Sequence, residues 1–313
     1  MHKDIKYTIA IPAFKGRFLK EAVESCLNQS TAPMEVIVLD DASPDDISGI
    51  CASFTDSRLK YFRNDINVGA ERVVDNWNKC LELASGDYFI CIGDDDRLTP
   101  NALATYSALI GRYPGLDVYH GQAEVIDENG SLKKTLPLRP EYESVYSLIW
   151  NRWNARKQQY VGDFCYRTDA LRRMGGFEFL PLAWGSDDIT AVKAASKTGI
   201  ANTSEVCFQY RDNGLSISNS LNQTIKMDAV CLEEKWYLSF LENEPDNEDD
   251  KVLWGKLVEQ LPDFYHRKKV YTMLCDLFSD KLSIFKWIRC HRDYQISCYD
   301  IFVAFLKALY RSL

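Results

Sequence analysis

Residues 88–96 read Tyr88-Phe89-Ile90-Cys91-Ile92-Gly93-Asp94-Asp95-Asp96, an apolar run that leads directly into three adjacent carboxylates. A short continuous apolar run is typical of a strand that is buried on both faces, as in a parallel sheet. Residues 7–12 and 35–40 form two more such runs, and polar residues follow each of them. Ligands bind at the carboxyl ends of strands in open α/β sheets, so we expect a site among these polar residues.

The first 120 residues alternate between strand-like and helix-like segments. Beyond the three runs above, the pattern predicts short strands at 59–62 and 116–120, and helices at 18–27, 47–54, 70–84 and 100–112. Strands that alternate with helices indicate an α/β fold with an open sheet.

The remainder of the chain divides at about residue 220. Residues 121–220 are less regular, with a hairpin-type turn at Glu128-Asn129-Gly130-Ser131. Helical patterns follow from 221, and an acidic stretch at 242–250, with six carboxylates in nine residues, predicts a solvated loop. Beyond this loop the pattern predicts separate helices at 251–260 and 264–278. We expect three segments: 1–120, 121–220 and a helical extension over 221–313.

Composition narrows the class of protein. The chain has 313 residues, 46% of them hydrophobic and 26% charged, which is ordinary for a globular protein of about two domains. The net charge of −8 argues against a nucleic-acid binder, which needs a basic footprint. The charge is uneven, because residues 264–313 carry nine Lys or Arg and only four Asp or Glu.

Cysteine usage and the N-terminal sequence bear on location. None of the ten cysteines forms a Cys-x-x-Cys pair, so we expect reduced, mostly buried thiols and no zinc site. Residues 1–6 contain no apolar stretch typical of a signal peptide, and no apolar run is long enough to span a membrane. These features predict a cytoplasmic protein.

Three groups of carboxylates carry the chemistry that the sequence suggests. Asp94-Asp95-Asp96 at a strand end suits Mg²⁺ or Mn²⁺, although an exposed acidic turn has the same pattern. Asp41 could accept a hydrogen bond from a nucleotide base, or its neighbourhood could simply cap a helix. Asp187, which precedes a predicted helix at 189–198, could be a general base or an N-terminal cap.

The order of these groups resembles family 2 of the glycosyltransferases, which are inverting enzymes with the GT-A fold. Nine segments, spread over residues 6–218, carry the resemblance: Ile9-Ala10-Ile11-Pro12-Ala13-Phe14 of the opening strand, the helix at 19–29 with its Ser-x-Leu-x-Gln ending, Asp40-Asp41-Ala42-Ser43 in place of Asp-Asp-Gly-Ser, Asn67-Val68-Gly69, the helix and strand at 76–88, Asp94-Asp95-Asp96 in place of Asp-x-Asp, residues 166–177, Gly185-Ser186-Asp187 in place of Gly-Glu-Asp, and residues 210–218 in place of Tyr-Arg-x-His-x-x-Ser-x-Ser.

The resemblance implies a GT-A fold, meaning a Rossmann-like open mixed sheet flanked by helices, and it implies roles for residues. The nucleotide-binding residues it implies are Pro12, Ala13, Phe14, Asp41, Asn67, Gly69, Asp94 and Arg211. Asp95 and Asp96 would bind Mg²⁺ or Mn²⁺, and Arg211 would hold a phosphate unless it forms an ordinary surface salt bridge. Asp187, rather than Asp188, would be the catalytic base.

Four positions depart from the family's pattern. Lys15 stands where Asn is usual, Ala42 replaces the turn glycine, and Gly93 replaces the first Asp of Asp-x-Asp-Asp. Asn213 replaces a His that assists metal or diphosphate binding in some members. We therefore expect a metal shell that is either softer or completed by the nucleotide alone.

The implied reaction moves a sugar from a nucleotide-sugar donor, most often a UDP-sugar, to a hydroxyl of a growing cell-surface glycan or lipid-linked glycan. In the middle of the chain, Trp150, Trp153 and Tyr160 could stack on a sugar or simply pack in the protein. Two alternatives remain at the level of sequence: a non-catalytic glycan- or nucleotide-binding protein on the same scaffold, and a nucleotidyltransferase. A nucleotidyltransferase would need a Gly-rich, basic phosphate loop, and Ala13-Phe14-Lys15-Gly16-Arg17 resembles one only faintly.

The basic C-terminal segment has the pattern of an amphipathic helix. Apolar residues at 296, 301, 302, 305, 306, 309 and 313 fall near one stripe, and Lys307 and Arg311 lie off it. Such a helix binds an anionic membrane surface, here the inner face of the plasma membrane, or packs on the protein itself or on a second copy of the chain.

Overall fold

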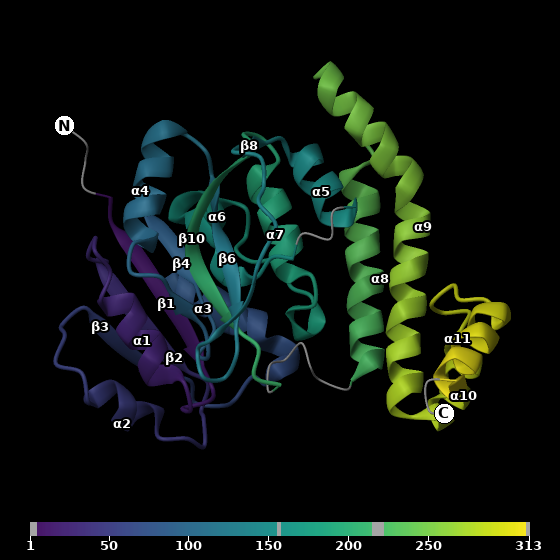
Figure 1. Ribbon diagram of the computed structural model, residues 1–313, viewed down its shortest axis with the longest axis horizontal. Coiled ribbons are helices and arrows are strands. Elements are labelled where there is room, and N and C mark those ends of the chain that lie inside the picture. The colour runs from purple at the N-terminus through teal and green to yellow at the C-terminus, as the bar shows by residue number, and fades with distance from the viewer. Residues whose placement is uncertain (1–4, 155–157, 215–221, 311–313) are drawn as a thin grey trace. The chain divides into compact units, whose positions relative to one another are not determined.

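The computed structural model of the chain describes residues 5–154, 158–214 and 222–310. These residues form two compact units. The first unit contains residues 5–154, 158–179 and 186–214, and the second contains residues 180–185 and 222–310. Figure 1 labels the helices and strands of both units.

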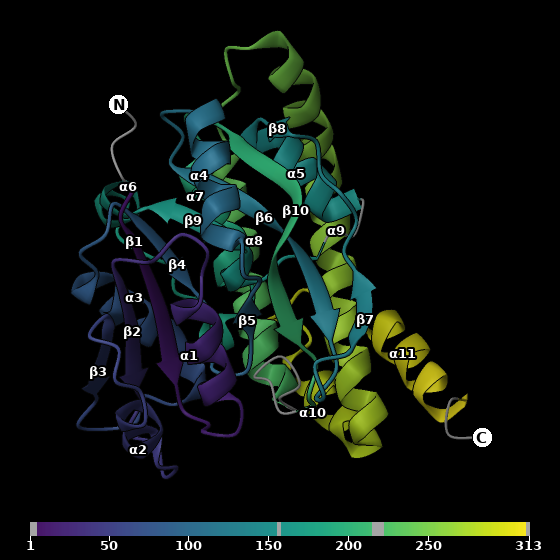
Figure 2. The same cartoon turned by 60° about the vertical axis from the view of Figure 1, so that its left-hand side comes forward.

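A mixed sheet, ten-stranded within the described residues, forms the framework of the first unit (Figure 2). Its strands are β1 (Tyr7–Ala13), β2 (Glu35–Asp40), β3 (Leu59–Arg63), β4 (Tyr88–Cys91), β5 (Arg97–Leu98), β6 (Val118–Ile126), β7 (Leu132–Thr135), β8 (Tyr142–Glu143), β9 (Phe164–Arg167) and β10 (Ile200–Arg211).

The strand order is β3-β2-β1-β4-β9-β6-β10-β5, with β7 paired to β6 and β8 paired to β10. Strands β3, β2, β1 and β4 are parallel, β9 runs antiparallel to both β4 and β6, and β10 runs parallel to β6. The predicted open mixed sheet is confirmed.

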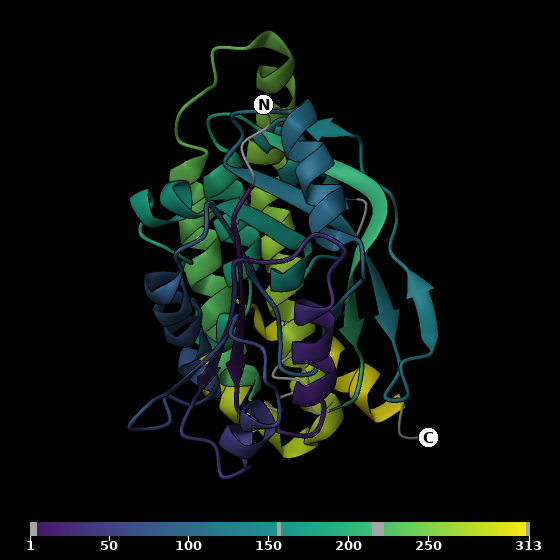
Figure 3. The same cartoon turned by 90° about the vertical axis from the view of Figure 1, so that its left-hand side faces the viewer.

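Helices cover both faces of this sheet. They are α1 (Leu19–Leu27), α2 (Ile47–Ala52), η1 (Ala70–Arg72), α3 (Val73–Leu83), α4 (Ala102–Arg112), α5 (Val145–Asn154), η2 (Val161–Asp163), α6 (Thr168–Arg173) and α7 (Ser186–Ala195). Side chains alternate between the faces of a strand, so Ile9 and Ile11 pack with residues of α1 and α4 in one core. On the opposite face, α3 places Trp77 against Phe177. Figure 3 shows α3 on the other side of the strands from α1 and α4.

The predicted elements of residues 1–120 agree closely with the structure, whereas the middle of the chain differs. The expected strand at 35–40 is β2, and the turn at 128–131 joins β6 to β7 as a hairpin with Gly130 at φ 80°. Strand β9 and helix α5 were not predicted. The boundary expected at residue 120 falls inside β6, so the two predicted halves share one sheet.

The second unit is helical. It contains η3 (Pro181–Ala183), α8 (Gln223–Phe240), α9 (Glu248–Ser279), η5 (Lys281–Ser283), α10 (Ile284–Cys290) and α11 (Cys298–Tyr310). Its core gathers Met227, Met273, Leu277 and Trp287 with apolar residues of α11.

Helix α9 corrects the expectation of two separate helices at 251–260 and 264–278. Pro262 removes one backbone donor and usually kinks or ends a helix, yet α9 continues through it. Leu257, Leu261 and Tyr265 on either side of the proline are buried, and burial of this stripe outweighs the lost hydrogen bond. The acidic stretch at 242–250 forms the loop before α9 and the first turn of that helix.

Two further expectations concern the thiols and membrane-spanning segments. All ten cysteines are free, and six of them are buried. Among the described residues, no helix combines the length and the apolar character needed to cross a membrane.

Candidate active site

The carboxylate of Asp94 joins the ends of strands β1 and β4. Its Oδ2 atom accepts hydrogen bonds from the backbone N–H of Phe14 and from that of the next residue, both at 2.7 Å. The backbone N–H of Asp41 donates to the carbonyl oxygen of Ala13 at 2.9 Å. The structure thus brings Ala13, Phe14, Asp41 and Asp94 together at the carboxyl ends of β1, β2 and β4, and Pro12 precedes them in β1.

Asp41 is buried and uses only one side of its carboxylate. Its Oδ1 atom accepts hydrogen bonds from Asn64 Nδ2 at 2.8 Å and from the backbone N–H of Val68 at 3.0 Å. Val68 is the middle residue of Asn67-Val68-Gly69, so that predicted element also lies at the site. Among the described residues, no donor reaches Oδ2 of Asp41, which leaves this oxygen as an acceptor for a ligand.

Three polar residues behind Asp41 were missed at the level of sequence. Asn64 Nδ2 also donates to Asn76 Oδ1 at 2.8 Å, and Lys79 Nζ donates to Asn64 Oδ1 at 2.7 Å. Asn64 and Asn76 are buried. The signal available in the sequence was one amide residue just after a strand, Asn64, and another within a helix, Asn76. An amide group that becomes buried needs hydrogen-bond partners. Together they fix the orientation of the Asp41 carboxylate.

Asp95 and Asp96 direct one oxygen each toward Gly93. A Cβ atom at position 93 would lie 2.8 Å from Asp96 Oδ2 and 2.9 Å from Asp95 Oδ1. A side chain there would therefore collide with both carboxylates, and glycine leaves room beside these two oxygens. Carboxylate oxygens suit Mg²⁺ or Mn²⁺, which take one or two carboxylates and complete their shells with phosphate and water.

No group of three or more His, Cys, Asp or Glu side chains within the described part of the chain is arranged to hold a metal ion. Carboxylate oxygens of Asp94 and Asp96 already accept hydrogen bonds from the protein, which explains this absence. Asp94 binds the β1 loop, and Asp96 Oδ1 accepts a hydrogen bond from the backbone N–H of Arg211 at 2.9 Å. A divalent ion at Asp95 and Asp96 would therefore need most of its ligands from the nucleotide.

The acidic triplet is electrostatically strained as it stands. Burial, followed by the adjacent charge of Asp95, raises the pKa of Asp94 to about 6. Burial, followed by the charge of Asp95, also raises the pKa of Asp96 well above its ordinary value. A bound cation would oppose both effects, because opposite charge favours the ionised carboxylate.

Arg211 differs from the expectation that it holds a phosphate or forms a surface salt bridge. Its side chain is 1% exposed, and protein oxygens take its donors. Nε donates to the carbonyl oxygen of Asp95 at 2.7 Å, Nη1 to that of Glu128 at 3.0 Å, and Nη2 to Glu21 Oε2 at 2.6 Å. In this arrangement Arg211 orders the acidic loop and is not presented to a ligand.

Glu21 and Arg97 complete this support and were also missed. Glu21 lies in α1 and pairs with both Arg211 and Arg97, and Arg97 Nε donates to Gln209 Oε1 at 2.6 Å. Hydrogen bonds from the two guanidinium groups lower the pKa of Glu21 against the opposing effect of its burial. Only the fold brings these distant positions together.

Asn213 occupies the position of the family's His and contacts the predicted metal ligand. Its Nδ2 atom donates to Asp95 Oδ2 at 2.7 Å, so it orients the carboxylate from behind. The following elements of the same motif, Ser216 and Ser218, lie outside the described residues.

The structure separates the two acidic residues at the start of α7. Asp188 is buried, and its Oδ1 atom accepts hydrogen bonds from Arg152 Nε at 2.9 Å and Gln159 Nε2 at 2.5 Å. Asp187 is half-buried, and no side chain in the described residues donates to its carboxylate. The geometry therefore leaves Asp187, and not Asp188, available to accept a proton.

The surroundings of Asp187 favour its protonated form. Burial, followed by the charge of Asp188, raises the pKa of Asp187 to about 7, against the opposing effects of Arg152 and of backbone hydrogen bonds. The charge of Asp187 in turn contributes to raising the pKa of the buried Asp163, after the larger effect of burial. A carboxylate tuned toward neutral pH is suited to general base catalysis.

Tyr160 lies between the acidic loop and the group around Asp187. Its ring stacks on Tyr210 with centroids 4.1 Å apart. Burial raises its pKa, and the nearby charges of Asp163 and Asp96 contribute. Tyr160 therefore lies near Asp96 of the acidic loop and near Asp163, whose own charged neighbours include Asp187.

Trp150 and Trp153, which together with Tyr160 were considered as sugar-stacking residues, lie in α5. Trp153 is 7% exposed and belongs to the core, so it packs within the protein. Trp150 is half-buried.

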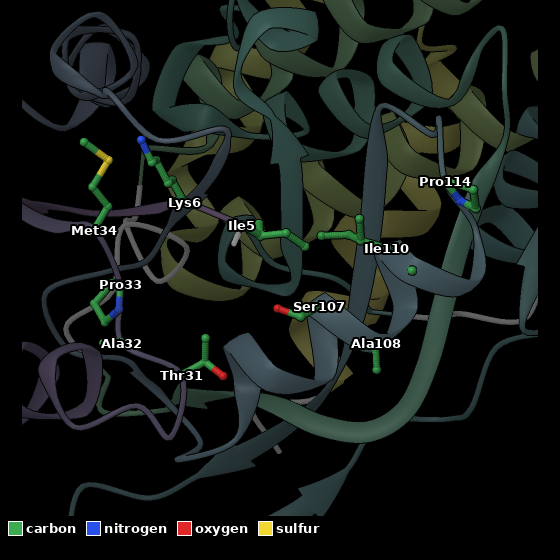
Figure 4. Close-up of a pocket in the computed structure, with 11 residues that line it drawn as sticks. Ile5, Lys6, Thr31, Ala32, Pro33, Met34, Ser107, Ala108, Ile110 and Pro114 are labelled. Atoms are coloured by element: carbon green, nitrogen blue, oxygen red, sulfur yellow. The ribbon is translucent and has the colours of Figure 1, made fainter. Parts of the chain in front are cut away.

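An open hollow of about 1220 Å³ lies at the opposite ends of the strands (Figure 4). It is lined by residues that precede β1 and β2 and by residues of α4, including Lys6, Met34 and Ser107. Lys6 is the one charged residue in its lining. None of the predicted site residues lines it.

Several curated proteins are similar to this chain. The putative colanic acid biosynthesis glycosyl transferase WcaA of Escherichia coli is 37% identical over 138 residues, covering 42% of this chain and 47% of that protein. The amylovoran biosynthesis glycosyltransferase AmsB of Erwinia amylovora is 28% identical over 217 residues, covering 58% and 68%. The chain spans about half of WcaA and about a third (31%) of a relative from Mycobacterium tuberculosis.

Solved structures share the fold. Residues 1–349 of TarS from S. aureus, in complex with UDP-GlcNAc, superpose with a TM-score of 0.64 at 16% identity, covering 98% of this chain and 92% of that one. The model of the family described as glycosyl transferase family 2 matches residues 8–179, which is more than half of the chain. On this match, and on a fold and motif order that agree with it, the chain belongs to glycosyl transferase family 2.

Proposed function

We propose that this protein is a metal-dependent, inverting glycosyltransferase that moves a sugar from a UDP-sugar to a hydroxyl group of a glycan. One observation carries the proposal. Asp41 and Asp94 lie at one end of the strands with an unused oxygen on Asp41, the acidic loop adjoins them, and no side chain within the described residues donates to the carboxylate of Asp187. This combination supplies separate groups for the donor, a metal and a proton.

The donor would lie over the ends of β1 and β2. Pro12, Ala13 and Phe14 would border the base, and Asp41 Oδ2 would accept a hydrogen bond from its N–H edge. The backbone around Asn67 and Gly69 would flank this pocket, since Val68 already donates to Asp41. Asp94 holds the loop after β1 in place through two backbone hydrogen bonds.

Asp95 and Asp96 would hold the divalent ion, and Asn213 and Arg211 would keep their loop in position. When bound, the ion neutralises negative charge on the departing nucleoside diphosphate. The chain supplies the rest of the environment for that charge.

Asp187 would remove the proton of the acceptor hydroxyl as that oxygen attacks the anomeric carbon. A new carbon–oxygen bond forms on one face of the sugar while the bond to the diphosphate breaks on the other, and the bonding electrons leave with the diphosphate. The anomeric configuration is inverted, and the proton remains on Asp187 until solvent removes it.

The comparisons support the choice of donor and acceptor classes. TarS was solved with UDP-GlcNAc and with UDP, so we propose a UDP-sugar. WcaA and AmsB are named for polysaccharide biosynthesis, and a relative from Campylobacter jejuni, 36% identical over 104 residues, is named for an undecaprenol-linked glycan. We propose a cell-surface glycan or a lipid-linked glycan as the acceptor.

A thermal-shift screen of nucleotide sugars with and without Mn²⁺ tests the donor class. We expect UDP-sugars to raise the melting temperature only with the metal present. Incubation with the best donor should then release UDP and free sugar slowly, with water as the acceptor. Release of pyrophosphate would indicate a nucleotidyltransferase, and binding without turnover would indicate a non-catalytic binding protein.

Substitution of Asp41 by Asn is expected to weaken UDP binding by about 10- to 100-fold, since a hydrogen bond to a charged group contributes roughly 1.5–3 kcal/mol. The amide keeps an oxygen for Asn64 and Val68 but replaces Oδ2 with a donor, which repels the base N–H. Calorimetric titration of UDP with Mn²⁺ measures the effect. Asp169→Asn, at an exposed position in α6, is the matched control. Equal affinities for both variants would contradict the role of Asp41.

We also propose that α11 rests on an anionic membrane surface. One face of α11 packs inside the protein, where Ile301, Ala304 and Ala308 are buried in the core of the second unit. The opposite face exposes apolar and aromatic side chains at Tyr299, Phe302, Leu306, Leu309 and Tyr310, which share one stripe at helical spacing.

The charge around this stripe favours lipid over a second copy of the chain. Residues 281–310 contain five Lys or Arg and two Asp, and Lys307, Arg289 and Arg292 are exposed. A basic rim around an apolar stripe is attracted to anionic headgroups, whereas two copies of the same basic face repel each other. Arg311 and Leu313, part of the predicted stripe, lie outside the described residues.

Flotation with vesicles tests this surface. We expect the protein to float with phosphatidylglycerol-containing vesicles and not with pure phosphatidylcholine, and Phe302→Ser/Leu306→Ser to stay in solution. Val252→Ser, at an exposed apolar position of α9, is the control. Equal flotation of all variants, or concentration-dependent dimers lost in Phe302→Ser/Leu306→Ser, would contradict the membrane proposal.

A further inference from the structure

The loop that follows β1 is held in place through its backbone. The N–H groups of Phe14 and Lys15 both donate to Asp94 Oδ2 at 2.7 Å. The N–H group of Gly16 donates to Asp45 Oδ2, also at 2.7 Å. The backbone of Lys15 therefore has a fixed position beside Asp94-Asp95-Asp96, the acidic loop.

The side chain of Lys15 starts at the acidic loop, and its charge acts on that loop. Lys15 is half-buried. Burial, followed by the charge of Asp95, raises the pKa of Asp94, and the N–H groups of Lys15 and Phe14 and then the charge of Lys15 oppose this rise. A lysine ammonium is a compact charge on a flexible four-carbon stem, so it can turn toward an anion that binds beside the loop.

The arginine side chains around the acidic loop have carboxylate partners within the protein. Arg211, to which the sequence assigned a phosphate, is 1% exposed and pairs with Glu21. Arg97 pairs with the same carboxylate, and Arg17 pairs with Glu128 at 2.7 Å. A phosphate group would have to compete with a protein carboxylate for any of these three guanidinium groups.

The charge of the site shows why a diphosphate would gain from a further cation. Asp94, Asp95 and Asp96 carry three negative charges when all are ionised, of which a divalent ion offsets two. The diphosphate of a nucleotide sugar brings more negative charge to the same end of the strands. Like charges repel most strongly where burial lowers the effective dielectric constant, so a protein cation beside the diphosphate would strengthen binding.

We propose that Lys15 binds the diphosphate of the nucleotide-sugar donor and supplies the positive charge that the sequestered Arg211 does not. An ammonium group suits this role, because lysine binds phosphate as a point charge and donates hydrogen bonds from three rotatable N–H groups. The inference rests on the proposed function, since it requires a nucleotide sugar at the carboxyl ends of β1, β2 and β4.

Lys15→Met tests this contact, because methionine keeps an unbranched side chain and removes the charge. We expect the affinity for UDP, measured by calorimetric titration with Mn²⁺, to fall about 10- to 100-fold, as for loss of a hydrogen bond to a charged group. The affinity for uridine, measured by competition with UDP, should not change, because uridine has no phosphate. Added salt should weaken UDP binding less in Lys15→Met than in the unmodified protein.

Two further variants separate a charge effect from a structural one. Lys15→Arg retains a cation and should restore most of the UDP affinity. Lys20→Met, the same substitution at an exposed position of α1, should match the unmodified protein. The melting temperature of Lys15→Met without nucleotide should also match, because the hydrogen bond to Asp94 comes from the backbone of residue 15 and is kept.

An unchanged UDP affinity in Lys15→Met would overturn the proposal. So would an equal loss of affinity for UDP and for uridine, because a disturbed loop after β1, rather than a lost phosphate contact, has that signature. UDP that binds equally well to Lys15→Met and the unmodified protein, but weakly to Asp41→Asn, would refute the role of Lys15 alone. An unmodified protein that binds no UDP would refute the proposed function, and this inference with it.

Discussion

Asparagine at position 187 is expected to abolish sugar transfer while leaving the affinity for UDP unchanged. The amide has nearly the shape of the carboxylate but cannot take a proton, and loss of a general base lowers rates by about 10²- to 10⁴-fold. Asp188 cannot substitute for it, because Arg152 and Gln159 already occupy its carboxylate. The measurement is the rate of UDP release together with a UDP titration, and Asp169→Asn, in the first turn of α6, is the control.

The pH dependence follows from the raised pKa of Asp187. Because burial places this pKa at about 7, the base is mostly protonated below neutral pH, and the turnover number should rise with pH through about 7 and then level off. Asp188, Arg152, Asp163 and Tyr166 are the titratable or charged neighbours that shape this transition. A rate that falls over this range would contradict the assignment.

The free energy of unfolding should change with pH in the direction opposite to that of the turnover number. In the unfolded chain an Asp ionises near pH 4, whereas Asp187 in the folded protein retains its proton to about 7. The unfolded state therefore releases a proton over this interval and the folded state does not, so the free energy of unfolding declines as pH rises. Asp187→Asn removes that loss and should melt at a higher temperature than the unmodified protein at pH 8. A lower melting temperature there would contradict the raised pKa of this carboxylate.

Alanine at position 95 is expected to eliminate the metal-dependent part of UDP binding. Asp95 is half-buried, one oxygen lies beside Gly93, and the other accepts a hydrogen bond from Asn213. A bound divalent ion contributes several kcal/mol to stabilising diphosphate charge, so the affinity gained on adding Mn²⁺ should be lost. Titration of UDP with and without Mn²⁺ measures it.

Asp169→Ala is the matched control for this change. Asp96→Ala is less informative, because Asp96 is buried and accepts the backbone N–H of Arg211, so its loss would also disturb β10. If Asp95→Ala bound UDP with Mn²⁺ as tightly as the unmodified protein, the metal site would have to lie elsewhere.

Elements with strong local signals could be predicted from the sequence. The apolar run at 35–40 is β2 at the predicted bounds. Every side chain in it is buried, and a strand that is buried on both faces has a continuous apolar run rather than an alternating one. Helix α9 could not be predicted as one element, since Pro262 is a local break that only packing overrides. Strand β9 was missed because it pairs with β4 and β6, which are distant in the sequence.

In the candidate site, too, residues with a local sequence signal could be predicted, whereas contacts that depend on distant packing could not. The acidic residues were found because they follow strands, and the ends of parallel strands meet in any sheet of this class. Arg211 was assigned to phosphate from its motif, whereas its burial against Glu21 and the Asp95 carbonyl depends on α1 packing beside β10. The choice of Asp187 over Asp188 came from the family's pattern, and its physical reason, the pairing of Asp188, became visible only in the structure. Residues 180–185 have no local signal at all for their place in the helical unit.

The configuration of the sugar released from a donor tests the central claim most directly. UDP-GlcNAc carries its sugar in the α configuration, and proton NMR distinguishes the two anomers before they equilibrate. With Mn²⁺ and water as the acceptor, this account predicts UDP and the β anomer of the free sugar, and neither product from Asp187→Asn. Release of the α anomer, or of UMP with a sugar phosphate, would contradict it.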